Sequence, residues 1–333
     1  MMRIVVALGG NALLKRGEPM TAEAQHTNVR IAAAALADLA RDHQIIVAHG
    51  NGPQVGLMAL QAAAYAPETL WPLDILGAET EGMIGYLIEQ ELMNALPNGT
   101  ECATLLTRVE VDPADPAFDQ PTKPIGPVYT AEDGKLIRAE HRWSMVEDSK
   151  GGLRRVVPSP LPVAILGIRP IRLLVEAGVC VICAGGGGIP VVRGADGNME
   201  GVEAVIDKDR TSALLAQALD ADVLLMLTDV EAVFRDWGGP DQAAIGSITP
   251  DALDAMTFAT GSMGPKITAA CDFVRAGGTM AGIGRLQDAR RIVEGVAGTQ
   301  VRMEPLAPEN RLPGEKNSGR VSKHQPEAVQ SPA

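Results

Sequence analysis

The chain has 333 residues, 46% of them hydrophobic and 21% charged, and its formal net charge is −12 at pH 7. A chain of this length and composition can bury a large core and is neither disordered nor fibrous. Because nucleic acids and anionic membranes attract positive surfaces, the acidic balance argues against both as the main partner. No apolar run reaches the roughly 18 to 20 residues of a membrane helix, and the first residues lack the layout of a signal peptide, so we expect a soluble, cytoplasmic protein.

Short apolar runs rich in β-branched residues recur along the chain, and glycine and then a helix-like pattern follow each run. The runs predict strands, in chain order, at residues 4–8, 44–48, 179–184, 223–227 and 279–283. Between the first two, residues 24–42 place apolar side chains on one helical face. Fully apolar strands that alternate with helices are typical of α/β proteins with a mainly parallel sheet covered by helices on both sides. Ligands then bind beyond the carboxyl ends of the strands, where these glycines lie.

Two stretches interrupt this alternation. Residues 109–160 are rich in Pro, Asp and Gly. Because a structureless loop of that length is improbable, they predict a small subdomain with its own hairpins that protrudes from the sheet. Residues 305–333 show no pattern and predict a disordered tail. We therefore expect one domain over residues 1–304, with the subdomain inserted in it and the tail after it.

The four cysteines are too few and too scattered for a disulfide framework in a chain this long. Cys180 and Cys183 form a C-x-x-C pattern, but it lies within an expected strand, where residues three apart point to opposite faces. We interpret both as buried core residues rather than as a disulfide or a pair of metal ligands.

Four glycine-rich turns follow expected strands or open expected helices. They are Gly9-Gly10-Asn11-Ala12, His49-Gly50-Asn51-Gly52-Pro53, Gly185-Gly186-Gly187-Gly188 and Gly261-Ser262-Met263-Gly264-Pro265-Lys266. Glycine lets backbone N–H groups approach an anion closely, although a single such turn is more often a tight exit from a strand. Four turns at one sheet edge favour a ligand with several phosphates, which Gly185 and Gly186 would help to bind. Neither G-x-G-x-x-G nor G-x-x-x-x-G-K-[ST] occurs, which disfavours a dinucleotide dehydrogenase and a Walker-type ATPase.

Three lysines stand in unusual settings. Lys123 lies between threonine and proline, Lys208 lies between two aspartates, and Lys266 follows a glycine–proline helix start. A lysine ammonium is a compact charge that can accompany a phosphoryl group during transfer. Because a cation is disfavoured at a helix start, we expect an anion such as phosphate to bind between Lys208 and Lys266.

Two aspartates each allow more than one role. Asp209 would serve as an ordinary N-cap of a helix over residues 210–219, or it could hold the lysine side chains in position. Asp229, after the strand at 223–227, could cap a turn or accept a hydrogen bond from a ribose hydroxyl.

Histidine is scarce, and only His49 lies in a glycine motif. No Ser-His-Asp or Cys-His set suggests itself, and no cluster has metal-ligand spacing. This inventory favours a reaction that needs no protein base.

Taken together and in order, these motifs resemble those of the carbamate kinases, within the amino acid kinase superfamily. The matching stretches are residues 7–13, 48–56, 121–127, 156–160, 184–191, 204–209 and 261–266, and the resemblance covers about residues 3 to 303. Each motif is weak alone, whereas the ordered set is highly specific. Other members of the superfamily commonly carry lysine where this chain has Asn11, and they lack the segment around Lys123.

The resemblance implies a three-layer αβα sandwich with a mainly parallel eight-stranded sheet, functioning as a homodimer. It implies reversible phosphoryl transfer between ATP and carbamate, giving ADP and carbamoyl phosphate, with Mg²⁺ carried by the nucleotide. Because carbamate is already an anion, its oxygen attacks without deprotonation. The protein then has to supply in-line positioning and charge stabilisation.

The resemblance also assigns roles to individual residues. Lys208 and Lys266 would neutralise the phosphoryl oxygens, Asp209 would orient these lysines, and Lys123 would reach over the acceptor. The turns around the acceptor and the transferring phosphate would be formed by Gly9, Gly10, Asn11, Gly50 and Asn51, with Asn11 among the catalytic residues. The nucleotide would be held by Thr228, Asp229, Met263 and Pro265.

Two other functions remain open from the sequence. One is a kinase of the same fold that acts on another small carboxylate, against which Asn11 and Lys123 argue. The other is a nucleotide-binding regulatory protein without turnover, which would have no need of Lys208, Lys266 and Asp209.

Overall fold

The centre of the molecule is an eight-stranded sheet. The computed structural model describes residues 1–14, 18–66, 70–97, 99–141, 143–148, 151–258 and 263–304, and within them the strand order is β15-β17-β16-β12-β1-β2-β9-β3. The strands are β1 (Arg3–Leu8), β2 (Gln44–His49), β3 (Cys102–Leu105), β9 (Cys180–Cys183), β12 (Val223–Thr228), β15 (Ser247–Ile248), β16 (Met280–Arg285) and β17 (Thr299–Val301). Every neighbouring pair is parallel except β16 with β17. The mainly parallel sheet expected from the sequence is therefore confirmed.

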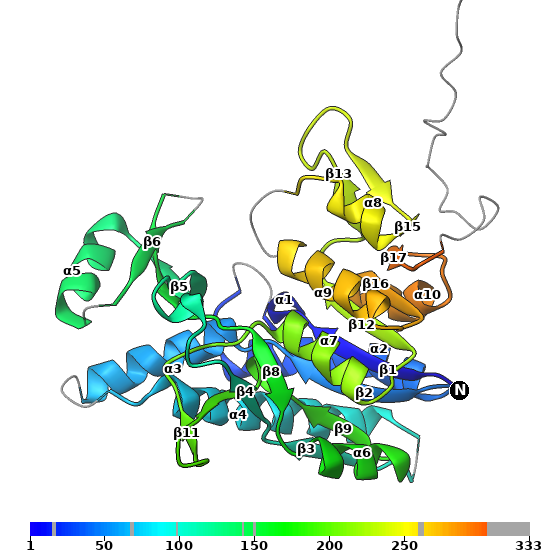
Figure 1. Cartoon of the computed structure of the whole chain (residues 1–333), viewed down its shortest axis with the longest axis horizontal. Helices are drawn as coiled ribbons and strands as arrows, with labels where there is room; N and C mark the ends of the chain where they lie inside the picture. Colours follow the sequence, from blue (N-terminus) through cyan, green and yellow to red (C-terminus); the bar gives the residue numbers. More distant parts are fainter. Residues whose placement is uncertain are drawn as a thin grey trace, which may run out of the picture.

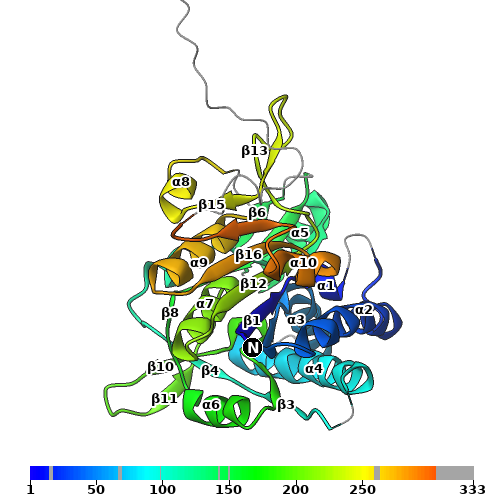
Figure 2. The ribbon, with the colours of Figure 1, turned by 90° about the vertical axis from the view of Figure 1, so that its right-hand side faces the viewer.

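Both faces of this sheet are buried, which is why its strands show no alternation of polar and apolar residues. In β1, Ile4 and Val6 belong to one hydrophobic core, and Val5 and Ala7 belong to the other. The first core includes side chains of α2 (Ala22–Ala40), α4 (Leu73–Ala95) and α10 (Ala289–Val293). The second includes side chains of α6 (Ile168–Glu176), α7 (Lys208–Ala218) and α9 (Met263–Arg275). Figure 2 shows the two helix layers on either side of the sheet, which is the three-layer sandwich that the resemblance implies.

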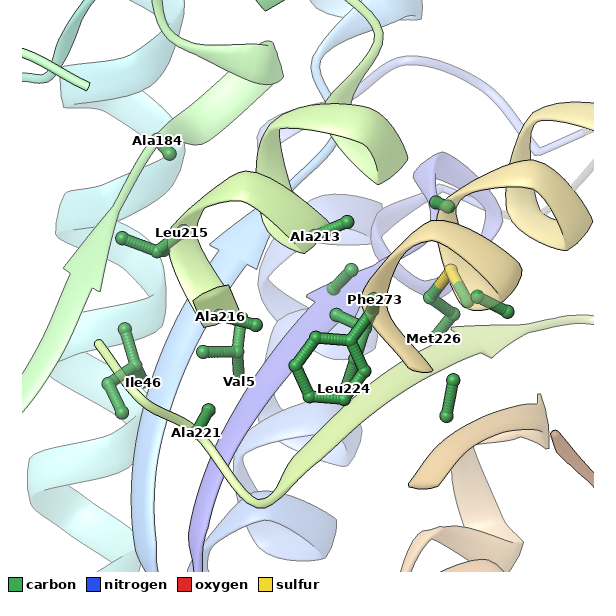
Figure 3. Packing of buried hydrophobic residues seen from close by; sticks show 14 of the residues in the cluster. Val5, Ile46, Ala184, Ala213, Leu215, Ala216, Ala221, Leu224, Met226 and Phe273 are labelled. Atoms are coloured by element: carbon green, nitrogen blue, oxygen red, sulfur yellow. The ribbon is translucent and has the colours of Figure 1, made fainter. Parts of the chain in front are cut away.

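The second core fixes the two helices that matter most for the site. Figure 3 shows Ala216 of α7 facing Val5 of β1, and Phe273 of α9 beside Leu224 of β12. Close packing of this kind allows little movement of a helix against the sheet. The first turns of α7 and α9 are therefore rigid supports for the charged side chains that they carry.

The two cysteines of the C-x-x-C pattern are buried on opposite faces of the sheet. Cys180 belongs to the core with α2 and α4, and Cys183 belongs to the core with α7 and α9. A disulfide or a shared metal ion would need both side chains on one face. The interpretation of both as core residues is confirmed.

A smaller three-stranded sheet projects from the main body, at the left of Figure 1. It consists of β5 (Lys123–Tyr129), β7 (Leu153–Val157) and β6 (Met145–Glu147), with helix α5 (Ala131–His141) beside it. We call these four elements the protruding subdomain. The helix α5 lies within the stretch 109–160, for which the sequence predicts a small subdomain with its own hairpins.

A four-stranded sheet, in the order β11-β10-β4-β8, completes the larger elements. Its strands are β4 (Arg108–Val111), β8 (Pro162–Ile165), β10 (Ile189–Arg193) and β11 (Met199–Gly201). The remaining elements include the helices α1 (Gly10–Leu13), α3 (Gly52–Tyr65) and α8 (Pro250–Asp254), and the strand pair β13 (Val233–Arg235) and β14 (Ala243–Ile245). No helix in the described ranges is long and apolar enough to cross a bilayer. Residues 305–333, predicted to be a disordered tail, lie outside the described residues.

Candidate active site

The first two glycine turns meet at the carboxyl ends of β1 and β2. Gly9 donates its backbone N–H to the carbonyl oxygen of Leu227 in β12 at 2.9 Å. A Cβ at Gly9 would lie 2.9 Å from the same oxygen, so only glycine allows this approach. A Cβ at Gly50 would lie 3.3 Å from the backbone nitrogen of Gly10 and 3.3 Å from side-chain carbons of Lys208. The turns after β1 and β2 therefore adjoin the Lys208 side chain.

The third glycine turn packs against the second. Gly186 has a φ of +67°, and a Cβ there would lie 2.2 Å from Nδ2 of Asn51. A Cβ at Gly185 would lie 2.3 Å from Nε2 of His49. Asn51 itself donates from Nδ2 to Oγ1 of Thr80 in α4 at 2.8 Å. Three of the four predicted turns thus gather at one sheet edge, as parallel strands require.

Two lysine ammonium groups share one aspartate beside these turns. Nζ of Lys208 donates to Oδ1 of Asp209 at 2.6 Å, and Nζ of Lys266 donates to Oδ2 at 2.9 Å. Asp209 is only 3% exposed. Burial alone would raise the pKa of Asp209, but the two ammonium groups hold it far below its ordinary value. The carboxylate is therefore ionised and fixes both lysines next to the glycine turns.

The cluster carries one positive charge in excess. Burial lowers the pKa of Lys208 to about 8, and the charge of Lys266 acts in the same direction. Burial also acts to lower the pKa of Lys266, but Asp209 outweighs it and raises that pKa above its ordinary value. The sequence predicts that phosphate compensates the two cations, whereas in the structure Asp209 already compensates one of them. The remaining positive charge favours binding of an anion.

The N-cap of α7 is Asp207 and not Asp209. The helix begins at Lys208, and Oδ1 of Asp207 accepts the backbone N–H groups of Asp209 at 3.0 Å and of Arg210 at 3.3 Å. Asp207 still has extended backbone, with φ −75° and ψ 119°, and follows the fully buried Ile206. The reading of Asp209 as an ordinary cap is therefore wrong. Its carboxylate remains available for the two lysines.

Lys123 reaches the same helix start from the protruding subdomain. Its Nζ donates to Oδ2 of Asp207 at 2.5 Å. Burial alone would raise the pKa of Asp207, but Lys123 outweighs it and holds that pKa below its ordinary value. All three predicted lysines therefore make ion pairs with aspartates in or next to the first turn of α7.

The predicted nucleotide residues lie on two neighbouring elements. Thr228 ends β12 and donates from Oγ1 to Oδ1 of Asp229 at 3.1 Å. A Cβ at Gly9 would lie 3.7 Å from Cα of Thr228, so this pair adjoins the first glycine turn. Met263 and Pro265 lie in the first turn of α9, which also carries Lys266.

Glu81 shapes the third glycine turn, and no sequence motif reveals it. Its Oε1 accepts the N–H of Gly185 at 2.8 Å, and its Oε2 accepts the N–H of Thr107 at 3.2 Å. Burial raises the pKa of Glu81 to about 8, although these two donors act to lower it. Because Glu81 lies within α4, 104 positions before Gly185, only the folded chain brings the two together.

Two polar groups from the motif around Gly50 are also buried. Gln54, in the first turn of α3, is 2% exposed, and its amide nitrogen and oxygen have no hydrogen-bond partner among the described residues. An unpaired buried amide is costly, which makes Gln54 a candidate for ligand contact. Burial lowers the pKa of His49 to about 4, so its ring is neutral at pH 7.

Some predicted residues cannot be placed. The side chain of Asn11 and the residues Gly261 and Ser262 of the fourth glycine turn lie outside the described part of the structure. In the part that is described, no three His, Cys, Asp or Glu side chains are grouped so that they could hold a metal ion.

Comparison with known proteins shows to which family the chain belongs. The sequence matches the amino acid kinase family over residues 2–283. It is 57% identical over 300 residues to the carbamate kinase of Haemophilus influenzae, covering 90% of this chain and 96% of that protein. It is 50% identical over 299 residues to the carbamate kinase of Escherichia coli K12, covering 90% and 99%. Among solved structures, carbamate kinase from Giardia lamblia bound to AMP-PNP matches with a TM-score of 0.81 and 38% identity, covering 90% of this chain and 98% of that one.

Proposed function

The chain belongs to the amino acid kinase family and is a phosphotransferase, and we propose that it transfers a phosphoryl group reversibly between ATP and carbamate, giving ADP and carbamoyl phosphate. The observation that carries this proposal is the buried cluster of Lys208, Asp209 and Lys266, which adjoins the glycine turns after β1 and β2. The identity to carbamate kinases over 90% of the chain supports carbamate as the acceptor.

The cluster suits phosphoryl transfer for an electrostatic reason. During transfer, negative charge spreads over the three oxygens of the moving group. Ammonium groups that Asp209 already holds in place stabilise this charge without reorganisation. Carbamate is an anion, so its oxygen attacks without losing a proton, and the reaction needs no general base. Backbone N–H groups of the glycine turns would align the acceptor with the phosphoryl group.

Magnesium would arrive with the nucleotide as part of the substrate. Mg²⁺ is usually held by one or two carboxylates together with phosphate oxygens and water. The described residues hold no group of three metal-binding side chains, which fits an ion held mainly by the phosphates. Thr228, Asp229, Met263 and Pro265 would hold the nucleotide beside the cluster. We expect the protein to act in the cytoplasm, where ATP is available.

A homodimer would form through the outer side of α4. Ile75, Tyr86 and Met93 are exposed, and their spacing of 11 and 7 residues puts them on one side of this helix. Leu106 is exposed beside them, since a Cβ at Gly82 of α4 would lie 3.8 Å from its side chain. An apolar stripe of this kind suits a self-complementary contact between two copies. Tyr86→Glu together with Met93→Glu should then yield a monomer in analytical ultracentrifugation, and an unchanged dimer would move the contact elsewhere.

ATP formation from ADP, Mg²⁺ and carbamoyl phosphate tests the proposed activity. We expect rapid ATP formation, and ADP formation from ATP with bicarbonate and ammonia in the reverse direction. Acetyl phosphate is a matched control, because it is an acyl phosphate that lacks the amino group. Equal use of acetyl phosphate would favour a kinase for another carboxylate. Tight binding of ATP without any turnover would favour a regulatory protein.

A further inference from the structure

Asp207 makes contacts in two directions from the start of α7. Its Oδ1 accepts the backbone N–H groups of Asp209 and Arg210, within the main body. Its Oδ2 accepts the ammonium group of Lys123 at 2.5 Å, from the protruding subdomain. One carboxylate therefore joins the two parts of the molecule.

Lys123 depends on this carboxylate to stay at the helix start. The N-terminus of α7 carries a partial positive charge, and the cluster of Lys208 and Lys266 adds an excess positive charge nearby, so a third ammonium group is repelled there. The side chains of Lys123 and Asp207 are 26% and 15% exposed, so water screens their attraction only in part. A hydrogen bond between two charged groups at this distance is among the stronger polar contacts.

The rest of the junction between the protruding subdomain and the main body is apolar, since Ile125, Trp143 and Val157 are buried together with Val55 and Val205, among other residues. Gly56 of α3 and Gly126 of β5 approach so closely that a Cβ at Gly56 would lie 2.0 Å from Cα of Gly126. Farther along α3, a cavity of about 210 Å³ lies between Ala59, Trp143 and Glu203, among other residues. The apolar contact holds the subdomain against α3, and the ion pair with Asp207 fixes the position of the Lys123 ammonium at this junction.

From this geometry we infer that Asp207 is a positioning residue, which docks the protruding subdomain and presents the Lys123 ammonium to the acceptor before substrate binds. The inference rests on the proposed function and on the role that the family resemblance implies for Lys123, which is to reach over the acceptor. Asp207 acts through Lys123 and does not touch the reacting atoms. Bound carbamoyl phosphate attracts Lys123 by its own negative charge, so Asp207 matters most in the free enzyme.

Asp207→Asn separates this role from the capping of α7. Asparagine caps a helix as well as aspartate does, so the thermal stability should be retained while the charge opposite Lys123 is lost. We expect the KM for carbamoyl phosphate to rise about tenfold and kcat to fall by less than about threefold, because saturating substrate restores the position of Lys123. The KM for ADP should stay within about twofold of the parent value. An unchanged or lower KM for carbamoyl phosphate would overturn the inference.

A double-mutant cycle shows whether Asp207 acts through Lys123. In a chain that already carries Lys123→Met, Asp207→Asn should change the KM for carbamoyl phosphate by less than about twofold, because its target has been removed. A full tenfold effect in that background would mean that Asp207 acts independently of Lys123, and it would also overturn the inference.

A measurement without turnover tests the docking separately from the proposed function. Trp143 connects α5 to β6 of the protruding subdomain and is buried with Val55 and Val205 of the main body. It becomes the only tryptophan when Trp71 and Trp237 are replaced by phenylalanine. In the ligand-free protein, Asp207→Asn should make Trp143 fluorescence more accessible to acrylamide, and parent-like quenching would contradict the docking. Increased quenching in a protein that forms no ATP would contradict the proposed function alone.

Discussion

Two lysine–aspartate contacts meet at the start of α7, and they differ in what holds them. Asp209 is buried between Lys208, which lies on α7 as Asp209 does, and Lys266, which lies on α9. Both helices pack against the central sheet. Asp207 pairs with Lys123, which is partly exposed and comes from the protruding subdomain. The first contact fixes charge within one packed body, whereas the second joins two bodies. In the proposed reaction, aspartates that are two residues apart would therefore serve different parts: Asp209 would hold the charges for the phosphoryl group, and Asp207 would hold Lys123 toward the acceptor.

Lys266→Met should damage the buried contact most. Methionine tolerates burial, so the fold should survive, but one preorganised charge beside the transferring group is lost. The kcat for ATP formation from ADP and carbamoyl phosphate should fall roughly 10² to 10³-fold. Lys135→Met, on the exposed surface of α5, is the matched control and should leave kcat unchanged. Parent-like turnover of Lys266→Met would remove the buried contact from the mechanism.

Asp209→Asn should have the next largest effect. Without the carboxylate, Lys208 faces Lys266 alone and loses its proton more readily, because Asp209 acts to raise the pKa of Lys208, which burial already lowers to about 8. We expect kcat to fall about 100-fold. The free energy of unfolding, measured by denaturation in urea, should fall by about 3 kcal/mol because a buried ion pair is broken. This free-energy value contains no contribution from a lost helix cap, because the N-cap of α7 is Asp207. Reduced stability with full activity would return Asp209 to a structural role.

Local sequence patterns predict most of the framework around the buried contact. Apolar β-branched runs predict strands to within a residue or two, as at 44–48, where the strand is Gln44–His49. Glycines after parallel strands must meet at one edge, and Gly9, Gly50 and Gly185 do so. The chain's capping residue at α7 could not be predicted, because Asp207 and Asp209 have the same capping chemistry. The choice depends on where the backbone stops being extended, which tertiary packing around Ile206 determines.

Contacts between distant segments carry no local signal. Lys123 and Asp207 are 84 positions apart, and Glu81 and Gly185 are 104 apart. Lysine before proline at 123 indicates an unusual setting but not its partner. Glutamate is common in helices, so Glu81 does not stand out in the sequence of α4. The contacts of such residues can be recognised only in the folded structure, where the topology places their elements side by side.

Raising the pH should weaken the buried contact selectively. Lys208 loses its proton above its pKa of about 8, whereas Lys266, with a raised pKa, stays charged. Because kcat/KM reports on the free enzyme, it should fall about tenfold between pH 7 and pH 9. Between pH 8 and 10.5 the unfolded chain binds a proton at Lys208 that the folded chain does not. The contribution of Lys208 to the free energy of unfolding should therefore rise with pH over that range, opposite to activity. A kcat/KM profile that stays flat to pH 10 would show that the charge on Lys208 is not needed.

Gly56→Ala should disturb the ion pair between Lys123 and Asp207, and we expect it to have the smallest effect on activity. The added Cβ would force α3 and β5 apart and move Lys123 away from Asp207. We expect the KM for carbamoyl phosphate to rise about three- to tenfold, with a smaller change in kcat. Gly77→Ala in α4 is the control, because a Cβ there meets nothing within 4 Å. This control should leave KM unchanged and stabilise the fold by about 0.5 to 1 kcal/mol. If Gly56→Ala and Gly77→Ala had equal KM values for carbamoyl phosphate, the contact between α3 and β5 would not affect the affinity for this substrate.

Helix α4 has apolar side chains on its outer side and the Glu81 carboxyl group on its inner side, against the amide of Gly185. An α-helix is a stiff rod about 10 Å thick, so a push on one side displaces the other. In the proposed dimer, subunit association and the position of the third glycine turn are therefore mechanically linked. Dilution that separates the subunits should therefore change the turnover rate.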